Sequence, residues 1–207
     1  GFDLRVMAAG VPGEGDLGRV QHLYHNMQQA AGDISINMRR AQQPVIAAVR
    51  GPAVGGGFSL ALASDVRIAG ESARFNAAFI RIGLSAGDMG ASYYLPRLIG
   101  LSRAAEYLLT GRFMDAATAE RIGLVSRVVP DDQVEAAALA LAEEMLQTAP
   151  LGLRVTKELL NMNLDASSLE SAIQLENRTQ VLCCLTEDAK EGTRAFLEKR
   201  PPVWHDR

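Results

Sequence analysis

Three consecutive glycines at positions 55–57 lie between an apolar run at 45–49 and an apolar stretch at 58–63. The first run is short, branched and bounded by Pro44 and Gly51, which is typical of a buried strand, and the second predicts a short helix. A strand that turns into a helix through glycine exposes backbone N–H groups at the positive end of the helix dipole. Such a turn can bind an oxyanion, although a turn that only allows close helix packing has the same pattern.

Two phosphate-binding patterns are excluded at this turn. No Gly-Lys-Ser/Thr sequence follows the glycines, so a P-loop is unsupported. The dinucleotide pattern G-x-G-x-x-G does not fit either, because Ser59 and Leu60 stand where its last glycine should be. The functional interpretation that remains is stabilisation of negative charge on a substrate carbonyl by backbone amides.

The rest of the chain predicts an α/β core followed by helices. Apolar residues recur at three- and four-residue steps in the helical segments, whereas the strand segments are short and rich in branched residues. The expected helices are 16–43, 58–63, 92–99, 116–121, 131–145, 151–164, 168–182 and 187–199, and the expected strands are 45–49, 66–69, 74–75 and 125–129. Strand, helix and strand in succession are typical of an α/β core.

Composition and charge exclude several classes of protein. The 207 residues are 48% hydrophobic and 22% charged, as in an ordinary globular chain. With a net charge of −3 and no basic stripe, we expect no nucleic-acid partner. No apolar segment approaches the roughly 18 residues that span a membrane, and the first residues do not resemble a signal peptide. Cys183 and Cys184 are adjacent, which disfavours an unstrained disulfide, so we expect a cytoplasmic protein.

A loop rich in glycine and serine, 83–90, precedes the expected helix 92–99 and carries one carboxylate, Asp88. Loops between rigid elements are common positions for catalytic groups. We expect the small and apolar neighbours to leave Asp88 partly desolvated, which suits a role in proton transfer. The structural alternative is that Asp88 caps the following helix, and the two roles are compatible.

Other polar residues near these motifs have simpler explanations. His22 and His25 lie three apart on a helix without an evident third ligand, so we expect no metal site. Tyr93, close to Asp88 in sequence, could donate a hydrogen bond to the substrate or the aspartate, or could pack in the core. Ser59 could orient water or substrate, but helix packing is the favoured explanation.

Ordered motifs along the chain carry a resemblance to a known family. They are Val-Ile-Ala-Ala-Val-Arg-Gly-Pro-Ala-Val-Gly-Gly-Gly at 45–57, Gly-Leu at 83–84, Leu-Pro-Arg-Leu-Ile-Gly at 95–100, Leu-Thr-Gly at 109–111, Ala-Glu-Arg-Ile-Gly-Leu-Val at 119–125 and Ala-Phe-Leu-Glu-Lys-Arg-Pro-Pro at 195–202. Together they resemble the crotonase superfamily, also called the enoyl-CoA hydratase/isomerase family. The resemblance covers nearly the whole chain.

The resemblance implies an α/β fold in two parts. A spiral of repeated ββα units, which binds acyl-CoA, would occupy residues 1–140, and a helical oligomerisation region would occupy 141–207. The opening residues 1–4 are similar to a segment that follows the first strands in the family, which implies that those N-terminal strands are absent from this chain. The family also implies a homotrimer or a dimer of trimers.

The resemblance further implies an oxyanion hole. Its donors would be the backbone N–H groups of Phe2 and Gly56, which would bond the thioester oxygen of an acyl-CoA; a core aromatic is the alternative for Phe2. Asp88 is similar to an aspartate that is the acid/base of dienoyl-CoA isomerases and the nucleophile of 4-chlorobenzoyl-CoA dehalogenase. Where hydratases of the family have two glutamates, this chain has Ser59 and Phe79, so the usual hydration mechanism is not expected.

Further residues are expected to contact the substrate and coenzyme A. The expected substrate-binding residues are Asp3, Leu4, Gly55, Ser59, Phe79 and Tyr93, and the expected coenzyme A contacts are Arg5, Phe196 and Lys199. A solvated helix end is the alternative for Lys199. No permanently bound cofactor is implied, because coenzyme A is part of the substrate.

The sequence thus predicts an acyl-CoA-transforming enzyme of the hydratase/isomerase type, with an enolate held by two amides and Asp88 as the single acid/base. One carboxylate suits moving a double bond better than hydrating it, because it can take a proton from one carbon and return it to another. Two alternatives remain open. Attack by Asp88, or by a water that it activates, would give dehalogenase or hydrolase chemistry, and a chain without turnover would be an acyl-CoA-binding protein.

Overall fold

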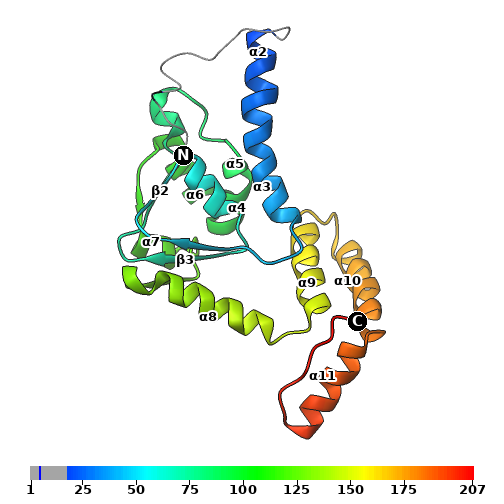
Figure 1. Cartoon of the computed structure of the whole chain (residues 1–207). Helices are drawn as coiled ribbons and strands as arrows, with labels where there is room; N and C mark the ends of the chain where they lie inside the picture. The colour runs from blue at the N-terminus through cyan, green and yellow to red at the C-terminus, as the bar shows by residue number, and fades with distance from the viewer. Residues whose placement is uncertain (1–4, 6–17) are drawn as a thin grey trace. The chain divides into compact units, whose positions relative to one another are not determined.

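The computed structural model describes residue 5 and residues 18–207 (Figure 1). The chain divides into two compact units. The first comprises Gly1–Arg39 and Val45–Ala138, and the second comprises Arg40–Pro44 and Leu139–Arg207.

The first unit starts, in its described part, with a long helical segment. It consists of α2 (Arg19–His22), a π-helical stretch η1 (Leu23–Gln29) and α3 (Ala30–Arg40). The expected helix at 16–43 is therefore confirmed within the described residues. The π-helical stretch was not predicted, because the apolar spacing of the sequence does not distinguish a π turn from an α turn.

Two small sheets follow in the described residues. β1 (Ile46–Val49), β3 (Val66–Gly70) and β6 (Arg127–Val129) pair in parallel in the order β1-β3-β6. In the other sheet, β2 (Pro52–Val54) is parallel to β4 (Arg74–Asn76), which is antiparallel to β5 (Met114–Asp115). β2 and β5 were not predicted, because they are too short to show an alternating pattern.

Helical segments lie between these strands, and the last two follow β6. They are α4 (Gly56–Ala63), η2 (Ala78–Ile82), α5 (Ala91–Ile99), α6 (Leu101–Thr110), α7 (Ala116–Arg121), η3 (Asp131–Gln133) and α8 (Val134–Leu146). Asp115 caps α7 by accepting a hydrogen bond from the N–H of Thr118 at 2.8 Å, and this bond lowers the pKa of the Asp115 carboxyl. α6 was not predicted.

The core of this unit lies where α4 and α5 meet the second sheet. Phe58 of α4 and Phe75 of β4 are both about 2% exposed or less, and their ring centroids are 5.9 Å apart. Leu62, Leu95 and Leu124 complete the most buried part of the same cluster. α4 is thus fixed along its length by buried apolar contacts, which makes its N-terminal turn a rigid position for a binding group.

The second unit is helical in its described structure. α9 (Pro150–Asn163), α10 (Leu169–Cys184) and α11 (Glu187–Glu198) confirm the three expected helices. Ser168 and Thr186 cap α10 and α11 through their side-chain oxygens. Cys183 and Cys184 are free thiols. No helix in residue 5 and residues 18–207 is both long and apolar enough to cross a membrane.

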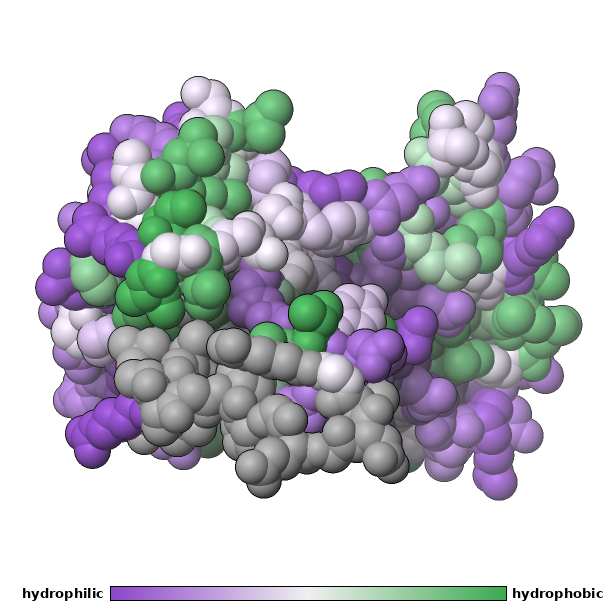
Figure 2. Space-filling model, turned by 90° about the horizontal axis from the view of Figure 1, so that it is seen from above, coloured by the Kyte–Doolittle hydropathy of each residue, from purple (hydrophilic) through white to green (hydrophobic). Residues whose placement is uncertain are grey.

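Large apolar side chains remain exposed on the helices of the second unit. Examples are Leu160 on α9, Leu164 just after its end, Leu182 on α10, and Phe196 and Leu197 on α11. Figure 2 shows one face of the molecule, on which hydrophobic residues reach the surface among hydrophilic ones. Such exposed apolar residues are frequent at contact surfaces between proteins.

Candidate active site

The glycine turn joins β2 to α4. Gly55 has φ 55° and ψ −123°, a backbone conformation that is accessible in practice only to glycine. Its N–H donates to the carbonyl oxygen of Asn76 at the end of β4 (2.9 Å), and its carbonyl oxygen accepts from the N–H of Ser59 (3.0 Å). The N–H groups of Gly56 and Gly57 have no acceptor within the described structure. They lie at the positive end of the α4 dipole and are available to an anion.

An apolar cavity of about 390 Å³ opens beside this turn. It is lined by Asn26, Met27, Ala30, Ala31, Ile34, Gly56, Gly57, Leu60 and Met89. Cavities of this size are typical of sites for small ligands, and apolar walls with few polar groups suit an acyl chain. The cavity therefore places an unpaired amide of α4 at the wall of an apolar compartment.

Most of these lining residues were not predicted as site residues. Met27, Ala30 and Ile34 belong to the apolar stripe of the helix at 19–40, and the spacing of that stripe predicts only a helix. The one available signal was that the stripe runs through a helix that is otherwise polar. Periodicity shows that a face is apolar, but it does not show whether that face meets the core or a cavity.

Asp88 is half-buried in the loop between η2 and α5. Its carboxylate oxygen Oδ1 accepts from the N–H of Met89 at 2.9 Å. Its main-chain oxygen accepts from the N–H of Ala91 (2.9 Å) and from the hydroxyl of Ser59 (3.0 Å). The N-cap of α5 is Gly90, with no side-chain hydrogen bond, so the alternative that Asp88 caps this helix is wrong. Among the described residues, Met89 lines the cavity and Asp88 itself does not.

The two positions where the family resemblance implied glutamate are both buried. Ser59 is fully buried, and its hydroxyl is donated to the Asp88 loop. Phe79 is 8% exposed, and its ring lies 3.4 Å from the point that a Cβ on Gly55 would occupy. Phe79 therefore packs against the glycine turn, which explains why an apolar residue suits this position.

Tyr93 and Tyr94 begin α5 beside the aspartate loop. Both are half-buried, and their rings meet edge to face with centroids 5.1 Å apart. The guanidinium of Arg97 lies 3.6 Å from the centroid of the Tyr93 ring. Burial raises the pKa of the Tyr94 phenol, and the nearby Arg39 opposes that rise. Tyr93 thus combines packing with a cation–π contact.

The remaining expected site residues fall elsewhere. Phe2, Asp3 and Leu4 lie outside the described residues, and Arg5 is exposed. In the second unit, Phe196 is 82% exposed on α11, and Lys199 is exposed just after it with φ 53°. Within residue 5 and residues 18–207, no three histidine, cysteine, aspartate or glutamate side chains are grouped to hold a metal ion.

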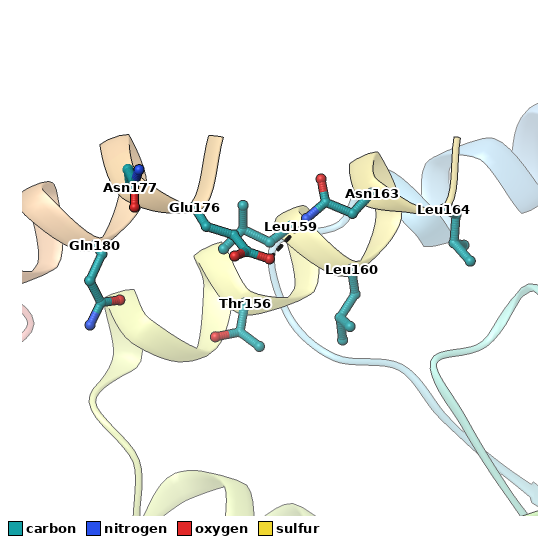
Figure 3. Close-up of a pocket in the computed structure, with 8 residues that line it drawn as sticks. All are labelled: Thr156, Leu159, Leu160, Asn163, Leu164, Glu176, Asn177 and Gln180. Carbon is teal, nitrogen blue, oxygen red and sulfur yellow. Dashed lines mark hydrogen bonds between the residues drawn. The ribbon is translucent and has the colours of Figure 1, made fainter. Parts of the chain in front are cut away.

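A second hollow, of about 690 Å³, lies between α9 and α10 in the second unit (Figure 3). It is lined by Thr156, Leu159, Leu160, Asn163, Leu164, Glu176, Asn177 and Gln180. Across it, Nδ2 of Asn163 donates to Oε1 of Glu176 at 3.3 Å. Its amide, hydroxyl and leucine side chains suit a contact surface better than bond-breaking chemistry.

Comparisons with known proteins show the family to which the chain is similar. The enoyl-CoA hydratase/isomerase family model matches residues 3–207. A protein named probable enoyl-CoA hydratase EchA12, from Mycobacterium tuberculosis, is 50% identical over 175 residues, which cover 84% of this chain and 61% of that protein. The chain thus spans less than two thirds of the length of this curated relative.

Solved structures agree as well. A probable enoyl-CoA hydratase/isomerase from Mycobacterium abscessus superposes with a TM-score of 0.89 at 42% identity, over 95% of this chain and 75% of that one. An enoyl-CoA hydratase subunit from Geobacillus kaustophilus superposes with a TM-score of 0.85 at 35% identity, over 99% and 75%. The chain belongs to the enoyl-CoA hydratase/isomerase family and has the crotonase-like α/β fold with C-terminal helices.

Proposed function

We propose that this chain acts on acyl-CoA thioesters by stabilising an enolate and moving a proton. The observation that carries the proposal is the unpaired N–H of Gly56, which lies at the N-terminus of α4 and at the wall of the apolar cavity. An amide in this position can bond a thioester oxygen while the cavity holds the acyl chain. The second donor is the N–H of Phe2, which rests on the family resemblance alone.

Asp88 is the proposed acid/base. One oxygen of its carboxylate accepts from the N–H of Met89, so the other is left to meet a substrate proton. The reaction that one carboxylate performs most simply is double-bond migration. Asp88 takes a proton from one carbon of the acyl chain, the electron pair moves into the enolate held by the amides, and the proton returns to another carbon.

The test is a panel of enoyl-, dienoyl- and hydroxyacyl-CoA thioesters, assayed with wild type and Asp88→Asn. We expect turnover of at least one thioester, with kcat lowered about 100- to 10,000-fold in Asp88→Asn. The matched control is Asp132→Asn, an exposed aspartate on η3, which should retain the wild-type rate. An Asp88→Asn variant that matches wild type would disprove the assigned role. Binding without turnover by the wild type would favour a non-catalytic acyl-CoA-binding protein.

We further propose a homotrimer or a dimer of trimers assembled through the second unit. The support is the set of exposed apolar side chains on α9, α10 and α11. An exposed Phe196 and Lys199 also agree with a role near coenzyme A bound to a neighbouring subunit, because each side chain is accessible from solvent. Comparing coenzyme A affinity of Lys199→Ala with wild type, at concentrations that preserve the oligomer, tests this contact.

A further inference from the structure

Ser59 carries a buried hydroxyl whose bond links two parts of the candidate site. It lies one helical turn after Gly56 on α4 and is 0% exposed. Its Oγ donates to the main-chain oxygen of Asp88 at 3.0 Å. Ser59 is not among the residues that line the apolar cavity. The hydroxyl therefore meets the aspartate loop and not the space proposed for the acyl chain.

This bond fixes the aspartate loop to the helix that carries the amide donor. The Asp88 carbonyl also accepts from the N–H of Ala91, so α4 and α5 both hold the same oxygen. The next residue, Met89, has a left-handed backbone with φ 49°, and its N–H donates to Oδ1 of Asp88. A non-glycine residue in this conformation persists only where the surroundings determine it. The hydrogen bond from Ser59 to the carbonyl oxygen of Asp88 is one of the contacts that hold Met89 in this conformation.

We propose that Ser59 is a positioning residue that sets the place of the Asp88 carboxylate relative to the amide of Gly56. The inference rests on the proposed function, because it gives Asp88 the acid/base role. Proton transfer requires the acid and the oxyanion donor to meet one substrate together, and displacement of a catalytic group by about 1 Å can lower a rate about 100-fold. In the described structure, the Ser59 side chain of α4 donates to the loop that carries Asp88.

Position 59 is also where this chain differs from the family pattern. The resemblance implies a glutamate at position 59 in hydratases, where it would face the reaction. In this chain the residue at that position is turned to the Asp88 carbonyl. The chain thus replaces a carboxylate on α4 with a hydroxyl that positions a carboxylate on the adjacent loop.

The main variant is Ser59→Ala, measured with a thioester that the wild type turns over. The Asp88 carbonyl keeps its bond from Ala91, so the fold is retained and the loop alone loses one tether. We expect kcat to fall about 10- to 100-fold with KM within about twofold of wild type. Ser59→Thr keeps a hydroxyl and should recover most of the rate.

The matched control is Ser64→Ala. Ser64 is 1% exposed, follows the end of the same helix, and donates its hydroxyl to the carbonyl of Ala61 at 2.6 Å. It has no recorded bond to the aspartate loop within the described structure. Loss of this buried hydroxyl should lower thermal stability as much as Ser59→Ala does, while kcat stays at the wild-type value. An equal fall in kcat for both variants would show a general packing effect and would overturn the inference.

The double variant Ser59→Ala/Asp88→Asn completes the test. If Ser59 acts through Asp88, the serine substitution should change the rate of Asp88→Asn by less than about twofold. The same 10- to 100-fold loss in both backgrounds would show that Ser59 acts independently and would overturn the inference. If Asp88→Asn loses activity and Ser59→Ala keeps the wild-type kcat, only the positioning role is lost. If Asp88→Asn is fully active, the proposed function itself fails.

Discussion

Gly55 is the residue on which the geometry of the candidate site most depends. Its φ of 55° and ψ of −123° let β2 enter α4 with the amides of the first turn unpaired. The ring of Phe79 covers the side on which a Cβ would stand. A Cβ there would make only ordinary van der Waals contact with that ring, so backbone strain is what disfavours any other residue at position 55.

We expect Gly55→Ala to lower the free energy of unfolding by about 1–3 kcal/mol, because alanine must adopt a backbone conformation reserved for glycine. The control is Gly32→Ala within α3, where a Cβ meets no atom within 4 Å. Alanine should stabilise that helix by about 0.5–1 kcal/mol. Chemical denaturation of both variants measures the two effects, and an equal response would contradict the strain assigned to Gly55.

At the scale of elements, the two ends of α4 differ in how their backbone groups are hydrogen-bonded. Its N-terminus leaves amides unpaired beside the cavity. At its C-terminal end, the guanidinium of Arg67 on β3 donates to the carbonyl oxygen of Ser64 at 2.8 Å. The same guanidinium also donates to the carbonyl oxygen of Leu124, outside α4, at 2.7 Å. Burial of this cation lowers the pKa of Arg67 to about 10. A positive charge at this end complements the helix dipole that the N-terminus uses.

Arg67→Met should therefore lower the free energy of unfolding by about 1–3 kcal/mol, because buried carbonyl oxygens lose their donors. Methionine retains a similar length without the charge. The control is Arg127→Met on the neighbouring strand β6, where the arginine is exposed and a change within about 0.5 kcal/mol is expected. Denaturant titration compares the two, and an Arg67→Met protein as stable as wild type would show that the buried hydrogen bonds contribute little.

The last segment of the chain is attached to α11 by charged contacts. Glu191 accepts from both terminal nitrogens of Arg200, at 2.6 and 3.0 Å, and from the N–H of Val203 at 3.0 Å. These bonds lower the pKa of Glu191 from 4.5 to about 2, and the bond from Arg200 has the largest effect. Both carboxylate oxygens of the nearby Asp188 accept main-chain N–H groups of the same segment. The segment runs back beside α11 to its first turn (Figure 1).

The lowered pKa of Glu191 predicts a pH dependence of stability. Because the folded state binds this proton less well, the stabilisation is complete above about pH 4.5 and is lost as the pH falls towards about 2. The difference in Tm between wild type and Glu191→Gln should therefore be largest near pH 7 and should shrink across that interval. Glu198→Gln, which removes the more exposed partner of Arg200, should show a smaller difference. A difference that does not vary with pH would contradict the assignment.

Sequence patterns predicted the longer elements and missed those that depend on tertiary contacts. The helices of the second unit and the strands around the glycines follow from periodicity, caps and glycine positions. β2 has three residues and begins with Pro52, so only its pairing with β4 defines it as a strand. For the proposed site, local chemistry points to the glycine turn and to Asp88, and the family resemblance implies Gly56 as the donor. The bond from Ser59 to Asp88 joins residues 29 apart, and no local pattern could reveal it.

At the scale of the whole molecule, large apolar side chains are exposed on the helices of the second unit. Leu160 on α9 is 66% exposed, Leu164 just after the end of α9 is 48% exposed, and both line the α9–α10 hollow (Figure 3). Contiguous exposed leucines are costly in water and are stabilised by burial against another chain, at about 25 cal/mol for each Å² covered.

If the second unit mediates assembly, replacing these leucines with charges should dissociate the oligomer. The double variant Leu160→Glu/Leu164→Glu should have the 22.2 kDa mass of one chain in light scattering, whereas wild type should have three or six times that mass. Leu109→Glu on α6, where the leucine is 76% exposed, is the control and should keep the wild-type mass. The outcome distinguishes the two surfaces, because dissociation by Leu109→Glu alone would place the interface on the first unit, and a monomeric wild type would remove the proposed assembly altogether.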